Sequence, residues 1–297
     1  MELTIETKLK LNDGHLIPQF GLGVWQIRAG AACETTVLAA LEAGYRHVDT
    51  ASMYGNEESV GAAIRTSGIP RENIFVTTKL WNSDHGNPER ALDTSLRKLK
   101  LDYVDLYLIH YPVRERRQSW RALEAMRAKG KARSIGVSNF TIRHLTELLA
   151  ETKTVPAVNQ VEFHPYLYQR DLLEFCTGKG IVVEAYSPLT QGKRLNDRKL
   201  VAVAKRYPSA GPHPTDRWSH LPLAHRLSRG PATKSTAQIL IRWALQHGLA
   251  VIPKSANRRR IFENADIFHF EITTEDMQHL DSLNEDLRTC WDPTNAP

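Results

Sequence analysis

The sequence predicts an α/β fold in which eight parallel strands form a closed barrel. Eight short runs rich in Val, Ile, Leu and aromatic residues alternate along the 297-residue chain with segments of helical period. Such alternation favours an all-parallel sheet, because each helix can return the chain to the start of the next strand. Eight is also a number of strands that closes a barrel whose interior side chains can fill.

Each element follows from its local pattern. Residues 8–19 hold Asp13-Gly14 between two alternating runs, which is typical of a β-hairpin. The eight expected strands are residues 19–25, 47–52, 74–81, 103–111, 132–140, 157–165, 181–189 and 249–255. The helices expected between and after them, several of which end in Gly, are residues 33–44, 56–68, 88–100, 119–130, 142–152, 169–180, 237–248 and 258–268. A last helix is expected over residues 273–284, which gives a (β/α)8 TIM barrel with an N-terminal β-hairpin and a C-terminal extra helix.

One segment interrupts the alternation. Residues 208–234 contain five prolines and show neither a helical nor a strand period. Irregular stretches of this length are uncommon inside compact domains. Such a segment could be a functional loop, a disordered insertion or an irregular sequence that the fold tolerates. We expect one barrel domain over residues 1–297, and our hypothesis is that residues 208–234 are an atypical Pro-rich insertion that carries no chemistry. Its histidines (His213, His220 and His225) lie in a segment without a helical or strand period, so we expect no metal site.

Composition limits the classes of function. The hydrophobic content of 41% and the charged content of 24% are ordinary for a soluble protein, and no apolar stretch reaches the length of a membrane span. The net charge is +6 at pH 7, but the basic residues are mostly dispersed and match no nucleic-acid-binding module. The three cysteines (Cys33, Cys176 and Cys290) lack a metal-like spacing, which favours a reducing compartment. We expect a cytoplasmic monomer without nucleic-acid or membrane partners.

Four polar residues lie at or just beyond the ends of the second, third and fourth expected strands. They are Asp49, Tyr54, Lys79 and His110. Strand C-termini of a barrel converge on one mouth, so these side chains should meet. Asp49 can neutralise a buried Lys79, and the Lys79 ammonium can lower the pKa of Tyr54, while His110 can orient a carbonyl oxygen. Singly, each could be a structural residue, but together they indicate that a carbonyl oxygen is protonated as its carbon is reduced.

The sequence gives only weak support for a Rossmann motif that would bind a hydride-donating dinucleotide. Gly21-Leu22-Gly23 begins a G-x-G-x-x-G pattern, but Gln26 occupies the place of the third glycine. A dinucleotide could instead bind across the barrel mouth. Amide and hydroxyl groups that could hold a carboxamide, a ring that could stack on it, and groups that could bind a phosphate all follow strand ends: Ser138, Asn139, Gln160, Tyr186, Lys254, Ser255 and Arg260.

At this point the chain resembles the aldo-keto reductases over nearly its whole length. The strings that carry the resemblance are GLGVW, GYRHVDTASMYGNEESVG, TTKLWN, LDYVDLYLIHYP, IGVSNF, VNQVEFHP, EAYSPL and VIPKSANRRRIFENADIF. It is most similar to the short-loop members, such as diketogluconate reductases and protist prostaglandin F synthases. The resemblance implies an NADPH-dependent reductase of aldehydes and ketones, of the alcohol dehydrogenase or carbonyl reductase type.

The resemblance also implies roles for individual residues. Tyr54 would be the proton donor, tuned by Lys79 and Asp49, and His110 would orient the substrate. Cofactor contacts beyond those above would come from Ser187, Leu189, Glu263 and Asn264, with Lys254 and Arg260 at the 2′-phosphate.

The substrate wall would consist of Trp25, Trp81 and Tyr111, although large aromatic residues are also common in barrel cores. Tyr111 stands where the family often has Trp, and its hydroxyl would add a polar group to the rim. The short C-terminal tail predicts a shallow, open pocket. The alternatives are a catalytically weak or inactive cofactor-binding barrel, crystallin-like or channel-associated, and a metal-dependent barrel enzyme, for which the strand ends lack ligands.

Overall fold

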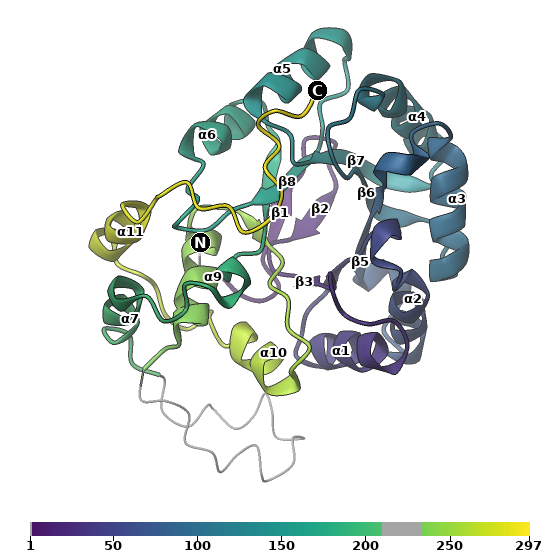
Figure 1. The fold of residues 1–297 in the computed structure, drawn as a ribbon. Coiled ribbons are helices and arrows are strands. Elements are labelled where there is room, and N and C mark those ends of the chain that lie inside the picture. The colour runs from purple at the N-terminus through teal and green to yellow at the C-terminus, as the bar shows by residue number, and fades with distance from the viewer. Residues whose placement is uncertain (1, 210–232) are drawn as a thin grey trace.

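Eight parallel strands follow one another around a single sheet (Figure 1). The structure is a computed structural model, and it describes residues 2–209 and 233–297. Within these residues the strands of the sheet are β3 (Leu22–Gly23), β4 (His47–Asp49), β5 (Phe75–Leu80), β6 (Val104–Ile109), β7 (Ala132–Ser138), β8 (Val158–Glu162), β9 (Val182–Tyr186) and β10 (Ala250–Val251). The predicted order of eight parallel strands is confirmed.

The two ends of the sheet meet and close the barrel. Phe20, just before β3, forms a parallel bridge with Val251 of β10. The Gly21 amide donates to the Val251 carbonyl over 2.9 Å, and the Val251 amide donates to the Gln19 carbonyl over 2.8 Å. First and last strands are therefore joined by the same type of hydrogen bond that joins the other neighbours.

Helices surround the barrel, as Figure 1 shows. Those that the structure describes are α1 (Ala31–Glu42), α2 (Glu57–Thr66), α3 (Pro88–Leu99), α4 (Arg116–Ala128), α5 (Ile142–Glu151), α6 (Arg170–Gly178), α7 (Arg198–Ala204), α9 (Thr236–Gln246), α10 (Arg258–Ala265) and α11 (Thr274–Asp281). The expected helices are all present, and α7 is an additional short helix that the sequence analysis did not predict.

Helix boundaries follow from local chemistry. Thr141 and Ser235 precede α5 and α9, and each side-chain oxygen accepts a hydrogen bond from the third helical amide, in a capping box. The glycines expected after helices adopt positive φ, which favours glycine because it has no Cβ. These are Gly44, Gly68, Gly130, Gly180 and Gly248.

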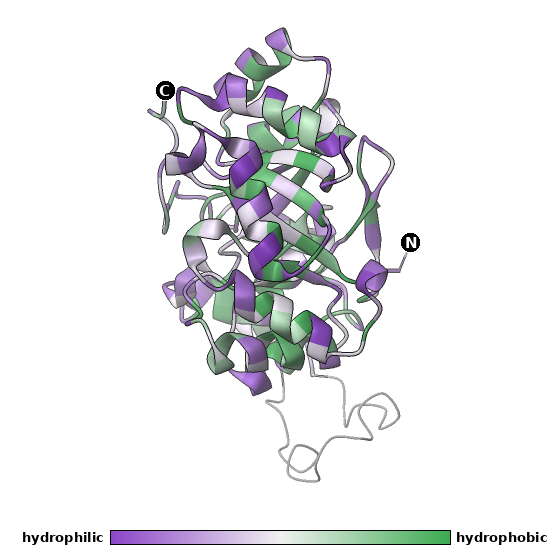
Figure 2. Ribbon diagram, turned by 90° about the vertical axis from the view of Figure 1, so that its right-hand side faces the viewer, coloured by the Kyte–Doolittle hydropathy of each residue, from purple (hydrophilic) through white to green (hydrophobic). Residues whose placement is uncertain are grey.

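The N-terminal hairpin lies at one end of the barrel. Strands β1 (Lys8–Lys10) and β2 (Leu16–Pro18) pair antiparallel, as predicted. Leu11, just after β1, and Ile17 of β2 are buried against strand residues that include Leu106 and Val158. Figure 2 shows this hairpin and the C-terminal segment on opposite sides of the molecule. The hairpin therefore packs on the barrel floor and leaves the other end for a site.

The buried apolar residues form a large cluster and a smaller one, the latter under the N-terminal hairpin. Most pack between the outer face of the sheet and the helices, where Trp120 and Trp243 are fully buried. Figure 2 shows the corresponding green stretches on strands and inward helix faces, with purple residues outside. Of the helices that the structure describes, none is long and apolar enough to cross a membrane. The barrel interior, by contrast, contains buried polar residues from β4, β5, β8 and β9.

The Pro-rich segment leaves and rejoins the barrel at one point. Pro208 and Thr233 form an antiparallel bridge, and the Lys234 amide donates to the Tyr207 carbonyl over 2.8 Å. These contacts lie between α7 and α9, in the helix layer. The rest of the predicted insertion, including its three histidines, lies outside the described residues.

Candidate active site

The four polar residues predicted to meet do so at one mouth of the barrel. Asp49 ends β4, Lys79 is the penultimate residue of β5, and His110 follows β6, while Tyr54 ends the short 3-10 helix η1 (Ser52–Tyr54). Lys79 is fully buried, and its Nζ donates to both carboxylate oxygens of Asp49 over 2.6 and 2.7 Å. A third bond runs from Nζ to the Thr50 carbonyl over 2.9 Å, so the buried ammonium is well satisfied.

Tyr54 lies beside this ion pair. The Lys79 Nζ lies 3.4 Å from the Tyr54 hydroxyl oxygen and 5.0 Å from the centre of its ring. Burial raises the pKa of Tyr54 well above 10, and the Asp49 charge raises it further. The predicted lowering of this pKa by the Lys79 ammonium is wrong for the free protein, because burial and the Asp49 charge act in the opposite direction. Tyr54 is a neutral phenol that still carries the proton it would donate.

His110 contacts both the phenol and the aromatic rim. Its ring packs edge-on against Tyr54 and Trp81, with centroids 5.7 and 5.1 Å apart. Burial and then the Lys79 charge lower its pKa well below 6.5, so the imidazole is neutral. Its Nδ1 is buried and has no hydrogen-bond partner among the described residues. A neutral imidazole has one N–H to donate.

A second set of polar groups, which sequence reasoning did not connect, lies under this cluster. Gln160 Nε2 donates to Asp49 Oδ2 over 2.8 Å and to Glu184 Oε2 over 2.7 Å. Glu184 is fully buried, and its other oxygen lies 3.5 Å from His47 Nε2. Gln160 and Glu184 are direct neighbours in the register of β8 and β9. A charged residue inside a predicted strand could have drawn attention to Glu184.

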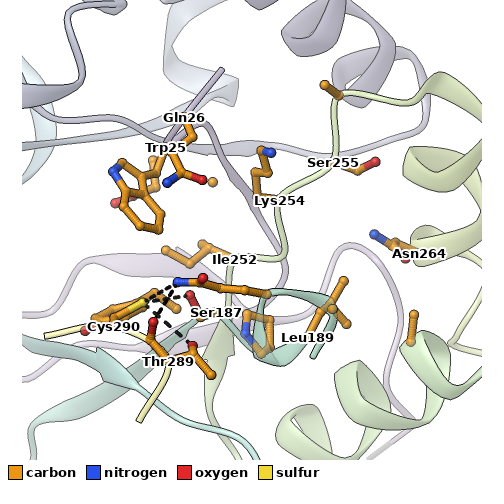
Figure 3. A pocket seen from close by; sticks show the side chains of 18 of the residues that line it. Trp25, Gln26, Ser187, Leu189, Ile252, Lys254, Ser255, Asn264, Thr289 and Cys290 are labelled. Carbon is orange, nitrogen blue, oxygen red and sulfur yellow. Dashed lines mark hydrogen bonds between the residues drawn. The ribbon is translucent and has the colours of Figure 1, made fainter. Parts of the chain in front are cut away.

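An elongated cavity of about 980 Å³ opens over the cluster. This volume is at the upper end of the range for ligand sites. Its walls include Asp49, Tyr54 and His110, while Lys79 lies beneath them. Every predicted cofactor residue lines it: Ser138, Asn139, Gln160, Tyr186, Ser187, Leu189, Lys254, Ser255, Arg260, Glu263 and Asn264. Figure 3 shows Trp25 and Cys290 at one end of this cavity and Ser255 and Asn264 at the other.

Near the cluster, a hydrogen-bonded group provides a flat polar wall. The Tyr186 hydroxyl donates to Asn139 Oδ1 over 2.7 Å, and Asn139 Nδ2 donates to the His110 carbonyl over 3.0 Å. Ser138 Oγ donates to the Gln160 carbonyl over 2.9 Å. Asn139 adopts a φ of 63°, a conformation that Asn tolerates better than most residues. A ring with a carboxamide could stack on Tyr186 and reach these amides and hydroxyls.

The far end of the cavity is basic. Lys254 and Arg260 line it, and neither side chain has an anionic partner within the described residues. Arg258, the first residue of α10, differs because it is paired with Glu42 over 2.5 Å. The Asn257 side chain caps α10 by accepting from the Arg260 amide. Two cations without a counter-ion at a helix N-terminus fit a phosphate group.

Of the predicted substrate residues, Trp25 lines the cavity, whereas Trp81 and Tyr111 flank it. Trp81 packs on His110 and on Trp291, with ring centroids 5.1 and 5.6 Å apart. The Tyr111 hydroxyl donates to the Asp292 carbonyl over 2.9 Å. This hydroxyl, predicted to add a polar group to the rim, anchors the C-terminal segment.

The C-terminal segment (residues 284–297) forms a wall that sequence reasoning missed. Thr289, Cys290 and Trp291 line the cavity, so the tail contributes to its wall although it is short. The amides of Thr289 and Cys290 donate to the Glu162 carboxylate over 2.8 and 3.0 Å. Gln191 Nε2, from the loop after β9, donates to the Thr289 carbonyl over 3.1 Å. Figure 3 shows Ser187, from the same loop, beside Thr289 and Cys290 of the tail.

The described residues contain no group of three or more His, Cys, Asp or Glu side chains arranged to hold a metal ion. The groups at the cavity that can take part in chemistry are those described above. They consist of a neutral phenol beside a buried ion pair, a neutral imidazole, and a long groove with an amide wall at one end and free cations at the other. Such a groove fits a phosphorylated dinucleotide with its ring end near Tyr54.

Comparisons with known proteins agree with this geometry. The sequence model of the Aldo/keto reductase family matches residues 19–285. The chain is 44% identical to the glyoxal reductase of Bacillus subtilis over 296 residues, which cover 99% of this chain and 98% of the relative. It is 43% identical to the methylglyoxal reductase of Yersinia pestis over 299 residues, 98% of each chain. It is also similar to a solved aldo-keto reductase of Bombyx mori in complex with NADP, with a TM-score of 0.84, 35% identity and 99% coverage of both chains.

Proposed function

We propose, on the premise that this chain belongs to the aldo/keto reductase family, that Asp49, Tyr54, Lys79 and His110 carry its reaction. Membership makes the protein an NADPH-dependent oxidoreductase that reduces aldehydes and ketones to alcohols. The observation that supports the four residues most directly is the contact of the buried Lys79–Asp49 pair with the Tyr54 hydroxyl.

The cofactor, when bound, supplies the hydride to the carbonyl carbon. We assign its carboxamide to Ser138, Asn139 and Gln160, and its ring to Tyr186. The remaining contacts would come from Ser187, Leu189, Lys254, Ser255, Arg260, Glu263 and Asn264 along the cavity. Among the described residues the side chains of Lys254 and Arg260 have no anionic partner, which supports NADPH over NADH, because only NADPH carries a 2′-phosphate on its adenosine ribose.

The protein residues handle the proton. The neutral His110 would donate a hydrogen bond to the carbonyl oxygen and hold it near the Tyr54 hydroxyl. Tyr54 would transfer its proton to that oxygen as negative charge develops there. The Lys79 ammonium, 3.4 Å from the phenol oxygen, would stabilise the phenolate that remains. Asp49 holds the ammonium in place and keeps it charged in a buried position.

We propose small, uncharged aldehydes with an adjacent carbonyl group as substrates. The names of the two relatives above support this class, since they are reductases of glyoxal and methylglyoxal. Trp25, Met53 and Trp291 line the substrate end beside Tyr54 and His110. None of these five side chains is charged, because the His110 imidazole is neutral. A small dicarbonyl compound could contact the aromatic wall and still direct one oxygen to both polar groups.

The test is Tyr54→Phe, assayed with methylglyoxal and NADPH. General acid catalysis contributes roughly 10²–10⁴-fold, so kcat should fall by about that factor. Binding of NADP⁺, followed by fluorescence titration, should stay within about twofold of the wild type because the phenol is not among the cofactor contacts. Unchanged turnover would refute the role of Tyr54. Absence of turnover in the wild type with a panel of carbonyls would instead favour an inactive cofactor-binding barrel.

We also propose that the protein is a cytoplasmic monomer in which residues 208–234 are an insertion within one barrel domain. The free state of Cys33, Cys176 and Cys290 supports a reducing compartment. The bridge between Pro208 and Thr233 supports an insertion, because the chain returns to the point it left. Light scattering would test the oligomeric state, and a mass near twice 33.6 kDa would refute the monomer.

A further inference from the structure

We propose that Glu184 is a positioning residue that fixes the side-chain amide of Gln160, so that Gln160 presents only its oxygen to the cofactor carboxamide. This inference rests on the proposed function, in which Gln160 contacts the carboxamide. Glu184 lies below the cavity and is not among the residues that line it. Its effect on the cofactor would therefore be exerted entirely through Gln160.

The geometry restricts the Gln160 amide to one orientation. The two hydrogens on Nε2 have separate acceptors, Asp49 Oδ2 at 2.8 Å and Glu184 Oε2 at 2.7 Å. Both acceptors are fully or almost fully buried. Turning the amide over would direct its oxygen at the acceptor-only Asp49 carboxylate and take its two hydrogens away from the acceptors they now have. Each lost partner would carry a desolvation cost of roughly 1–3 kcal/mol, so the observed orientation is strongly favoured.

The remaining atom of this amide is available to a ligand. Gln160 lines the cavity, and no described residue donates a hydrogen bond to its Oε1. Oε1 can therefore accept a hydrogen bond from the N–H₂ of a carboxamide but can donate none. Asp49 alone would bind one hydrogen of Nε2 and leave the other free to turn toward the cavity. Glu184 removes that freedom.

A buried carboxyl group at this place requires an explanation, since burial of an uncompensated polar group is unfavourable. The groups that face Glu184 are Asp49 and His47 from β4, Lys79 from β5 and Gln160 from β8, with Tyr54 acting at longer range. Burial and the Asp49 charge raise the pKa of Glu184 to about 8. The carboxyl is thus mainly protonated at neutral pH, and Lys79 balances Asp49 alone.

The experiment compares NADP⁺ with its 3-acetylpyridine analogue, in which a methyl ketone replaces the carboxamide and the N–H₂ donor is lost. The wild type should bind NADP⁺ about tenfold more tightly than the analogue, because the analogue leaves Gln160 Oε1 unpaired. Glu184→Met cannot accept from Gln160, so this preference should fall to less than about threefold. Glu184→Gln retains an acceptor oxygen and should restore the preference.

Glu57→Met provides the matched control. Glu57 is another buried carboxyl, which accepts from Thr78 and lies on α2 without contact to Gln160. Its variant should keep the wild-type preference for NADP⁺ even if it loses stability. Equal preference in Glu184→Met and the wild type, or a preference lost equally in Glu57→Met, would overturn the inference.

The outcome does not depend on the folding of one variant. If Glu184→Met fails to fold, a wild type that binds NADP⁺ and the analogue equally would still refute the inference. Failure of the proposed function is distinguishable, because it would show as Tyr54→Phe with unchanged turnover. Failure of the inference alone would leave the effect of Tyr54→Phe intact.

Discussion

The two ends of the cavity differ in how far their charges are satisfied within the described protein. At the reactive end, Lys79 is fully buried and makes three hydrogen bonds to Asp49 and Thr50. At the phosphate end, Lys254 and Arg260 are exposed, and neither has an anionic partner among the described residues. The reactive end is thus organised before any ligand arrives, whereas the phosphate end is completed by the ligand.

This difference indicates how each end would contribute to function. A preformed polar cluster loses little free energy to reorganisation when charge develops, which favours the rate of the chemical step. Free cations near a surface attract an anion but are screened by salt, which favours affinity. Substitutions at the reactive end should therefore change turnover and stability, and those at the phosphate end should change cofactor affinity.

The largest expected effect is that of Lys79→Met. It leaves the buried Asp49 without its cation, so the free energy of unfolding should fall by about 3–5 kcal/mol, measured by urea titration. Turnover should also fall by at least about 10²-fold, because the phenolate loses its stabilising charge. The double variant Lys79→Met/Asp49→Asn removes both charges and should regain part of the stability. If Lys79→Met alone were as stable as the wild type, the contrast between the two ends would be refuted, because the reactive end would not depend on its ion pair.

The second effect is that of Arg260→Ala on the dissociation constant of NADPH. Loss of a charge-assisted contact should raise this constant roughly 10–100-fold, with kcat little changed and NADH affinity within about threefold. Arg259→Ala is the matched control, since Arg259 is an exposed arginine on the same helix that does not line the cavity. Equal losses for NADPH and NADH would contradict a phosphate contact at this end.

A third prediction concerns the pH dependence of stability at the reactive end. Folded Glu184 holds its proton up to about pH 8, whereas an unfolded glutamate loses it near 4.5. Between these values the folded state binds more protons, so this residue makes the free energy of unfolding fall as the pH rises. Glu184→Gln cannot titrate, and its stability relative to the wild type should increase by at least about 1 kcal/mol from pH 5 to pH 8. A constant difference between the two proteins would show that Glu184 is ionised throughout.

The smallest expected effect lies away from both ends. Replacing residues 209–232 by Asn-Gly would join Pro208 and Thr233 through a two-residue hairpin turn. If the segment is an insertion without chemistry, kcat and the dissociation constant of NADPH should stay within about twofold, as expected for a change distant from the site. A large loss of cofactor binding would show that the segment belongs to the phosphate end, and the simple two-end description would have to be revised.

The sequence was sufficient to predict the barrel and the residues at its strand ends. Asp49, Lys79 and Gln160 could be found because strand periodicity and parallel topology determine where a strand-end side chain lies. Trp291 could not be found in this way. Its position depends on the path of an irregular tail, which Glu162 and Tyr111 fix through hydrogen bonds between residues far apart in the chain.

The pattern of residue types also could not predict the pKa of Tyr54 or the contact between Glu184 and Gln160. The spacing of Tyr54 and Lys79 indicated their contact but not the loss of water around the phenol, which is the largest cause of its raised pKa. Glu184 occupied an inward position of a predicted strand, yet its pairing with Gln160 required the register of β8 and β9. Burial and register are properties of the assembled barrel, so local residue types do not reveal them.

The bridge between Pro208 and Thr233 has a consequence for how such a chain can evolve. When a segment leaves and re-enters at one bonded pair, its length is nearly decoupled from the rest of the molecule. Each doubling of a flexible loop costs only about 0.6 kcal/mol of closure free energy, which a stable barrel can tolerate. Mutations that lengthen or shorten the chain here would be close to neutral, so new sequence can accumulate at this position without selection acting on the mouth of the barrel.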